Sequence, residues 1–230
     1  MTVSFIGAAS AEATSLTLPT HQAGDLIIFG AFRNGSVTLP TLPSGWLILN
    51  AQGAATAGLQ RSMYFAYKYA ASSSETSDTW TDANLVAAIV FRDDTNIIIP
   101  HVTQAATLNN ATTANYTAAA HNTSTGTASA TNRLQQSSQW VVGFAACLSN
   151  TSAINTAPTG MTNRTATAGA SASEIAIHDT NGTVSSFNAS TSLGETTSII
   201  SLTIGIADTG IAKSSGGGFR HVNIRGGADQ

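Results

Sequence analysis

Charged residues are scarce in this chain, and their scarcity excludes several classes of function. Only 9% of the 230 residues are Asp, Glu, Lys or Arg, whereas about 25% is usual for a globular domain. Nine Lys and Arg stand against twelve Asp and Glu, which gives a net charge of −3. Binding to a phosphate backbone needs clustered cations that release counterions. We therefore expect that nucleic acid is not a partner.

Cysteine and long hydrophobic runs are also nearly missing. The single cysteine excludes an intramolecular disulfide framework. Cys147 closes the apolar run 140–147 with no activating base beside it, which favours a buried, inert thiol. No run reaches the roughly 18 apolar residues of a membrane span. Residues 1–20 lack a basic region followed by an apolar region, so we expect no secretory signal and no membrane partner.

The motifs of common enzyme classes are absent. The sequence contains no nucleophile elbow, phosphate-binding loop or dinucleotide fingerprint, and its glycine run 216–218 follows Lys213 instead of preceding a Lys-Ser/Thr pair. The five histidines are scattered without the spacing of a helical zinc site. Four Glu and eight Asp leave few candidates for paired glycosidase carboxylates. The sequence thus predicts no enzyme activity, no catalytic residue, no cofactor and no metal site.

Three groupings with acidic residues have simpler structural interpretations. His178-Asp179 is the only adjacent His–carboxylate pair, and we interpret it as polar residues at a strand end because no nucleophile is specified nearby. Asp93-Asp94 and the segment 78–82 lack the spaced glycine loop of a calcium site. We interpret them as solvated loop carboxylates.

Three tryptophans are candidates for a sugar-stacking platform. Trp46 begins an apolar run and Trp140 opens another, so core packing is expected for both. Trp80 lies between two threonines and is the one tryptophan expected at the surface.

The residues that are present predict β-strands. Ala, Thr and Ser number 38, 33 and 26, and Thr and Ser are mediocre helix formers. Segments 63–69 and 200–206 alternate apolar and polar residues, as half-buried strands do. Segments 26–32, 85–91 and 140–148 are short continuous apolar runs, typical of strands buried on both faces. Turn residues separate these segments. We expect an all-β, antiparallel β-sandwich that is jelly-roll-like.

An internal repeat divides the predicted sandwich into halves, at about 24–95 and 139–210. Segments 26–33, 43–46, 64–68 and 85–93 recur as 141–148, 158–161, 175–179 and 200–208. The offsets are 115, 115, 111 and 115 residues. Chance similarity among low-complexity strands is the alternative. If the repeat is real, each half forms one sheet of a sandwich or half of a barrel-like jelly roll, and the two halves share a core. Between the halves, 103–138 is dense in Ala, Thr, Asn and Ser, and we favour weakly patterned edge strands there over an irregular loop.

The C-terminal tail differs from the predicted domain, which spans 1–213. Residues 214–230 are rich in glycine and lack a core pattern. We expect this extended tail to dock on a neighbouring subunit, with Phe219 as its apolar anchor and with Arg220 and Arg225 pairing with acidic or carbonyl groups.

Four short motifs resemble a pattern of bacteriophage virion proteins. They are Gly24-Asp-Leu-Ile-Ile-Phe29, Pro43-Ser-Gly-Trp46, Tyr67-Lys-Tyr-Ala70 and Thr79-Trp-Thr81. The resemblance covers residues 2–95 well and 139–210 more loosely. It implies a β-sandwich that decorates a capsid or builds a tail-associated surface, and it implies no site residues.

The composition agrees with this resemblance. A weakly charged surface rich in Thr, Ser and Ala is unusual for a free protein, because net charge supports solubility, but it suits a surface buried against neighbours. We expect a non-enzymatic structural protein of a virion, assembled in the host cytoplasm as a symmetric oligomer such as a trimer and contacting other virion proteins. The alternatives are a tail or fibre component that contacts the host receptor, and a carbohydrate-binding or adhesin module.

Overall fold

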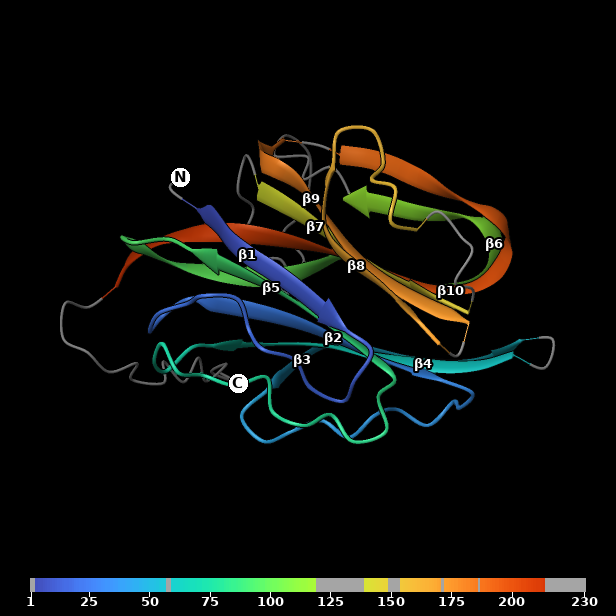
Figure 1. The fold of residues 1–230 in the computed structure, drawn as a ribbon. Helices are drawn as coiled ribbons and strands as arrows, with labels where there is room; N and C mark the ends of the chain where they lie inside the picture. Colours follow the sequence, from blue (N-terminus) through green and yellow to red (C-terminus); the bar gives the residue numbers. More distant parts are fainter. Residues whose placement is uncertain are drawn as a thin grey trace, which may run out of the picture.

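The chain folds into two five-stranded antiparallel sheets packed face to face (Figure 1). The structure is a computed structural model that describes residues 3–56, 59–118, 139–148, 154–170, 172–185 and 187–213. No helix occurs within these ranges. The prediction of an all-β sandwich is therefore confirmed.

Each sheet is built from one contiguous half of the chain. The first contains β1 (Ser4–Ala11), β2 (Leu26–Asn34), β3 (Leu47–Thr56), β4 (Leu59–Tyr69) and β5 (Leu85–Arg92). The second contains β6 (Asn96–Ala118), β7 (Gln139–Cys147), β8 (Thr162–Gly169), β9 (Ser173–Val184) and β10 (Phe187–Ala212). This arrangement gives no support to the jelly-roll-like detail. The expectation of an edge strand after residue 103 holds as far as β6 extends, and 119–138 lie outside the described residues.

The main core lies between the two sheets. It contains the inward-facing side chains of β2, β4 and β5 on one side and of β7, β9 and β10 on the other. Phe65 meets Phe144 edge to face at 6.0 Å, and Phe91 meets Trp140 at 5.4 Å. Edge-to-face geometry is favourable because the positive ring edge meets the negative ring face. These contacts join the two halves of the chain.

The outer faces of the central strands are buried as well. Loops and strand ends cover the outer face of the first sheet around Phe29, Trp46 and Trp80. Ile154 and Phe187 belong to the cluster on the outer face of the second sheet. β2, β5 and β7 are buried on both faces over most of their length. This double burial explains their continuous apolar runs, as the sequence predicted.

The two sheets have the same strand order. The first runs β1-β5-β2-β4-β3 and the second runs β6-β10-β7-β9-β8, so each strand corresponds to the one five places later in the chain. The strand pairings agree too. Phe32 pairs with Met63 in the first sheet and Ala146 with Ile175 in the second. Ile28 pairs with Ile89, and Val142 with Ile204.

These pairings, combined with the side chains that face the shared core, correct two of the offsets taken from the sequence. The structural offsets are 114 residues from Phe32 to Ala146, 112 from Met63 to Ile175 and 115 from Ile89 to Ile204. An offset of 115 for β2 or 111 for β4 is one residue out of register, and it would exchange the inner and outer faces, because side chains alternate with a period of two.

Local irregularities also recur in both sheets. The β3–β4 pairing skips Leu49, and the β8–β9 pairing skips Arg164, 115 residues later. The turns that precede β3 and β8 match as well. Gly45 and Gly160 both have φ near 85°, a conformation that glycine adopts without strain. In each turn the residue after the glycine donates its N–H to the carbonyl of the turn's proline.

Candidate functional site

A cluster of aromatic rings lies beneath the loops on the outer face of the first sheet. Trp80 stacks on Phe29 with ring centroids 5.0 Å apart and an interplanar angle of 7°. Trp46 meets both rings, at 5.2 Å from Phe29 and 5.5 Å from Trp80. Trp80 is 0% exposed, so its predicted surface position is wrong. The two flanking threonines suggested exposure, but the indole is buried and its N–H donates to the Ser77 carbonyl. The predicted burial of Trp46 and Trp140 is confirmed.

Lys68 connects this cluster to two acidic side chains. Its ammonium nitrogen lies 4.5 Å from the centre of the Trp46 ring and donates to Glu75 Oε1 and Asp78 Oδ2, both at 2.9 Å. It also donates to the Thr76 carbonyl at 2.8 Å. Trp46 Nε1 donates to the same Asp78 oxygen at 2.8 Å. The nearly buried lysine therefore has a partner for each of its three protons.

The hydrogen bonds from Lys68 keep both carboxylates ionised. Partial burial by itself would raise the pKa of Glu75, but the hydrogen bonds from Lys68 and the Ala71 N–H outweigh it, and the pKa lies below its usual value. The pKa of Asp78 is lowered in the same way, against partial burial, by hydrogen bonds from Lys68 and Trp46. A carboxylate with a lowered pKa is a poor general base and is not protonated near neutral pH, so it is also a poor general acid.

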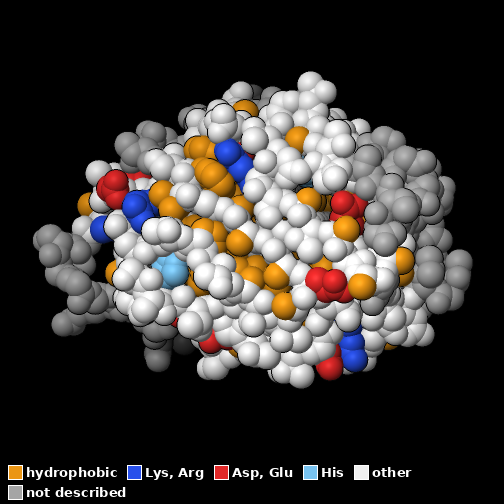
Figure 2. All heavy atoms as spheres, in the orientation of Figure 1, with side chains coloured by type: hydrophobic (Ala, Val, Ile, Leu, Met, Phe, Trp, Pro, Cys, Tyr) orange, Lys and Arg blue, Asp and Glu red, His pale blue; other side chains and the backbone are white. Residues whose placement is uncertain are grey.

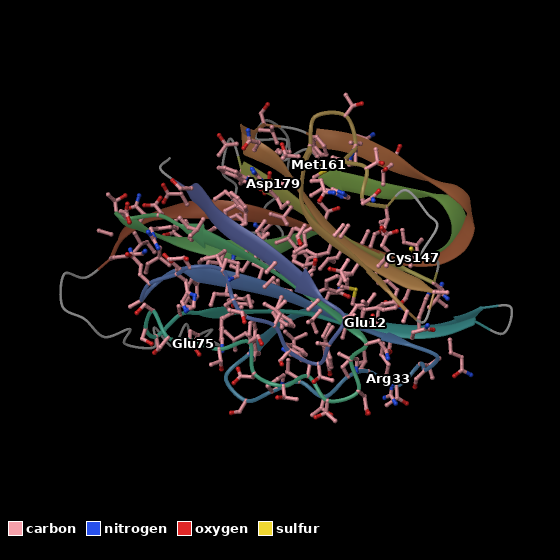
Figure 3. The ribbon with its side chains drawn as sticks, in the orientation of Figure 1. Glu12, Arg33, Glu75, Cys147, Met161 and Asp179 are labelled. Carbon is pink, nitrogen blue, oxygen red and sulfur yellow. The ribbon has the colours of Figure 1, made fainter. Side chains whose placement is uncertain are left out.

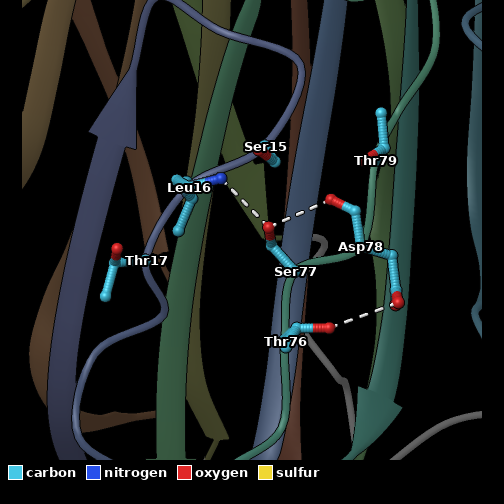
Figure 4. Close-up of a pocket in the computed structure, with 7 residues that line it drawn as sticks. All are labelled: Ser15, Leu16, Thr17, Thr76, Ser77, Asp78 and Thr79. Carbon is cyan, nitrogen blue, oxygen red and sulfur yellow. Dashed lines mark hydrogen bonds between the residues drawn. The ribbon is translucent and has the colours of Figure 1, made fainter.

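An open depression of about 430 Å³ lies beside this network (Figure 4). Its lining consists of two segments rich in hydroxyl groups, 15–17 and 76–79. Ser77 ties them together, because its hydroxyl accepts from the Leu16 N–H and donates to the Asp78 carbonyl. Thr76 donates to the remaining Asp78 oxygen at 3.3 Å. The serine is thus committed to backbone groups, and no histidine lines the depression.

The His178-Asp179 pair is buried in a strand and does not lie exposed at its end. Both residues are 0% exposed and belong to β9, so the strand-end interpretation is wrong. Asp179 Oδ2 accepts from Arg164 Nε at 2.8 Å, and its Oδ1 accepts from the Asn181 N–H. Burial lowers the pKa of His178 to about 4, against a hydrogen bond with the Ile154 backbone. A neutral imidazole and a carboxylate bound to arginine fit a structural role better than a catalytic one.

The carboxylate of Asp93 organises a turn. The residue is 0% exposed, so its interpretation as a solvated carboxylate is wrong. Asp93 Oδ1 accepts from the N–H groups of Thr95 and Asn96, both at 2.9 Å, and from the Thr95 hydroxyl at 2.8 Å. Aspartate often forms turns of this kind because its short side chain reaches the backbone just ahead. Cys147 is fully buried, as predicted.

The ion pairs are spread over different parts of the sandwich. Figure 3 shows Glu12, Arg33, Glu75 and Asp179 around different parts of the fold. In the part of the chain that the structure describes, no three His, Cys, Asp or Glu side chains are placed to hold a metal ion. Phe219, Arg220 and Arg225 lie outside the described residues. The predictions of no enzyme activity, no cofactor and a docking tail therefore stay predictions.

The Lys68 network is the feature that sequence reasoning missed. One signal was present: Lys68 is the charged residue of an otherwise uncharged aromatic segment, 63–69, and acidic residues follow within ten positions. What the sequence did not show was the loop that brings Glu75 and Asp78 back over β4.

The comparisons with known proteins found no match to this chain among protein-family models, curated proteins or solved structures. Among the described residues, there is no helix of the length and apolarity needed to span a membrane.

Proposed function

We propose that this chain is a non-enzymatic structural protein of a bacteriophage virion, a capsid decoration or surface protein that works as a symmetric oligomer. The observation that supports a structural role best is how its few charges are used. Among the described Lys and Arg residues, all except Arg61 are bound to groups of the same chain. An enzyme or a ligand-binding protein usually leaves some polar groups pointing into a cleft.

The surface supports the assembly part of the proposal. Figure 2 shows a face made mostly of neutral side chains and backbone, with few acidic or basic groups and scattered apolar ones. Large apolar side chains that are exposed include Val37, Leu47, Ile48 and Ile211. Such a surface has little charge to oppose close packing against neighbours. The motif resemblance directs the proposal to virions, with capsid or tail proteins as partners and assembly in the host cytoplasm.

The proposal is tested on intact particles. An antibody against this chain, labelled with gold, should decorate phage particles released from a lysed host that carries the gene. Labelling should form a regular pattern on the capsid. Labelling confined to the tail or fibres would favour the alternative of a tail component that contacts the host receptor. Particles without label, in a lysate that contains the protein, would contradict a virion role.

A carbohydrate-binding or adhesin module is the second candidate, and the depression beside Asp78 is the observation that favours it. Hydroxyl groups and a partly exposed carboxylate can bind sugar hydroxyls, but the neighbouring indoles are buried and offer no stacking face. Glycan-array binding that is lost in Thr17→Val, a variant of one lining residue, would support this candidate. Trp80→Ala is unsuitable as a control because it would empty the core of the loop cluster.

A further inference from the structure

The first half of β3 lies at a sheet edge and carries exposed apolar side chains on both of its faces. β3 ends its sheet and pairs only with β4. Leu47 pairs with Tyr67, whose side chain faces the other sheet, and Ile48 pairs with Ala66, which belongs to the outer cluster. Leu47 is 48% exposed and Ile48 is 54% exposed. A strand added beside β3 would cover both side chains, whereas a partner docking on one face would cover only one of them.

This edge lacks two of the devices that normally prevent strand addition. β3 contains no charged residue and no proline, although proteins commonly protect an edge with one or the other. β3 lies beside β6 on one side of the sandwich, and β1 lies beside β8 on the other side. Between β1 and β8, Ser10 shares hydrogen bonds with Thr165 and Thr167. β3 does carry a bulge at Leu49, but Leu47 and Ile48 before it are exposed.

The C-terminal tail has a sequence suited to occupy this edge. Residues 214–218 read Ser-Ser-Gly-Gly-Gly, a composition typical of linkers. Residues 219–225 read Phe-Arg-His-Val-Asn-Ile-Arg, in which Val222 and Ile224 alternate with polar residues. That alternation is typical of a strand with one apolar face. The segment 219–225 is long enough to pair along the exposed first half of β3.

Direction and reach favour the tail of a second copy. Lys213 donates its backbone N–H to the Thr95 carbonyl and its ammonium to the Gly24 and Asp93 carbonyls, and Gly24 in turn bonds to Ala70. The tail therefore leaves the fold at the end of the first sheet where β3 begins. From there, its own segment would run parallel to β3, although every pairing in the sheet is antiparallel.

An antiparallel arrangement within one chain is out of reach. Residue 219 would have to lie about 20 Å along the strand and about 14 Å across the sheet, estimated from the rise per residue and the strand spacing. Six extended residues span at most roughly 21 Å, which is less than this diagonal. A neighbouring copy can supply the segment in either direction.

We propose that residues 219–225 of one copy add as an antiparallel strand to the β3 edge of a neighbouring copy, with Val222 and Ile224, which share one face of the added strand, packing beside Ile48 on the outer face of the sheet. This inference rests on the proposed function, because it supplies the contact of the proposed symmetric oligomer. It also gives Phe219, Arg220 and Arg225 their place, since their backbone would belong to the added strand.

Cross-linking between variants of the full chain that each carry one added cysteine tests this arrangement. Ala51→Cys places a thiol on the exposed first half of β3, and Asn223→Cys places one in the tail, while the native Cys147 is buried. The two variants are mixed and treated with a short bismaleimide. A covalent dimer is expected in the mixture. Thr162→Cys, exposed on the β8 edge, is the matched control and should give no dimer with Asn223→Cys.

Each other outcome overturns the proposal. A dimer from Ala51→Cys alone would show that two β3 edges pair with each other. A chain that carries both substitutions could instead form a cross-link within itself while the mixture gives no dimer. That result would show that the tail binds its own edge. No cross-link at all would remove the strand addition. If wild-type protein is still an oligomer by light scattering, only this interface is lost, whereas a monomer at every concentration removes the proposed oligomer as well.

A surface variant provides a second measurement. Ile48→Lys should weaken association at least tenfold in sedimentation equilibrium, because it places a charge on the edge that the added strand must cover. Ile211→Lys is the matched control, since Ile211 is 60% exposed and lies off β3. Equal association of the two variants would contradict the proposal.

Discussion

At the scale of single residues, Arg61 is the anomaly of this fold. It lies on β4 and is 0% exposed, and in the part of the chain that the structure describes none of its three guanidinium nitrogens has a hydrogen-bond partner. Desolvation lowers its pKa. A buried charge without a partner costs several kcal/mol, because no interaction replaces the lost hydration. Arg92, in contrast, binds the buried carboxylate of Asp25 through two nitrogens at 2.8 and 2.7 Å.

These two arginines should respond to the same substitution in opposite ways. Arg61→Met should raise the free energy of unfolding by about 1–3 kcal/mol, because it removes an unpaired charge and keeps the apolar stem. Arg92→Met should lower it by on the order of 3 kcal/mol, because Asp25 would stay buried without its cation. Urea unfolding at pH 7 measures both values. Destabilisation by Arg61→Met would show that the guanidinium makes a contact that its geometry does not reveal.

The buried His178 should make the fold sensitive to mild acid. Burial lowers its folded-state pKa to about 4 from a usual value of 6.5. Between these values the unfolded chain binds more protons than the folded chain, so stability is full above pH 6.5 and declines as the pH falls towards 4. The shift corresponds to about 2 kcal/mol lost between pH 7.5 and pH 5. In His178→Gln this part of the pH dependence should vanish, as measured by urea unfolding at the two pH values. An equal slope in both proteins would refute the assignment to His178.

The limits of sequence reasoning at this scale are visible in Trp80 and Asp93. Trp80 was predicted to be exposed because its immediate neighbours are polar, and Asp93 because its segment lacks the pattern of a calcium site. Both are buried by segments that are distant in sequence or by their own turn: Phe29 stacks on Trp80, and Thr95 and Asn96 bind the Asp93 carboxylate. Cys147 was predicted correctly because its own apolar run determines its burial. Local sequence patterns therefore predicted burial correctly for residues within strands. They failed where a loop or a turn buries the side chain.

At the scale of elements, β2 and β7 fit together because corresponding positions carry very different side chains. Gly30 of β2 corresponds to Phe144 of β7 at the offset of 114 residues. A Cβ atom at Gly30 would lie 2.6 Å from Met63 Cε and 3.0 Å from Phe144 Cδ1. The missing side chain of one half therefore makes room for the large ring of the other. Two sheets with identical side chains could not pack in this way, because the core has a glycine in one sheet against a large ring in the other.

Enlarging Gly30 should be costly, and the cost should depend on Phe144. Gly30→Val is expected to lower the free energy of unfolding by about 1–3 kcal/mol through overpacking, and Phe144→Ala by about 3–5 kcal/mol through the cavity it leaves. In the double variant the valine occupies part of that cavity, so the loss should be at least about 1 kcal/mol smaller than the sum. Urea unfolding of the four proteins completes the cycle. Simple additivity would mean that the two side chains do not compete for space.

The strands themselves were largely predictable, whereas their register was not. Runs such as 26–32 and 85–91 identified β2 and β5, because strands buried on both faces have no polar alternation. The repeat was read with an offset one residue too large for β2. Continuous apolar runs contain no period-two signal, so nothing in them distinguishes the inner from the outer face. The pairing with neighbouring strands supplies that information.

At the scale of the whole molecule, the described residues between 3 and 213 form a core of their own. The central strands β2, β5 and β7 are buried on two faces, and ion pairs join loops to strand ends and β8 to β9. We therefore expect residues 1–213 to fold without the tail. The sequence predicted the sandwich, but function was not predictable to the same depth, because the motifs that identify common active sites are absent from the sequence.

Removing the tail should therefore separate folding from assembly. A chain ending at Lys213 keeps the anchoring contacts of that residue with Thr95, Gly24 and Asp93. Its free energy of unfolding, measured at concentrations where wild-type protein is monomeric, should stay within about 0.5 kcal/mol of wild type, as expected when no buried group is removed. Its self-association should weaken at least tenfold in sedimentation equilibrium, because the segment proposed to add to β3 is gone. A matched chain that keeps the tail but carries Val222→Asp and Ile224→Asp should behave in the same way, since charges on the apolar face of the added strand prevent its burial beside Ile48. If the shortened chain unfolds, the tail belongs to the fold itself. If it is stable and associates as strongly as wild type, assembly uses another surface.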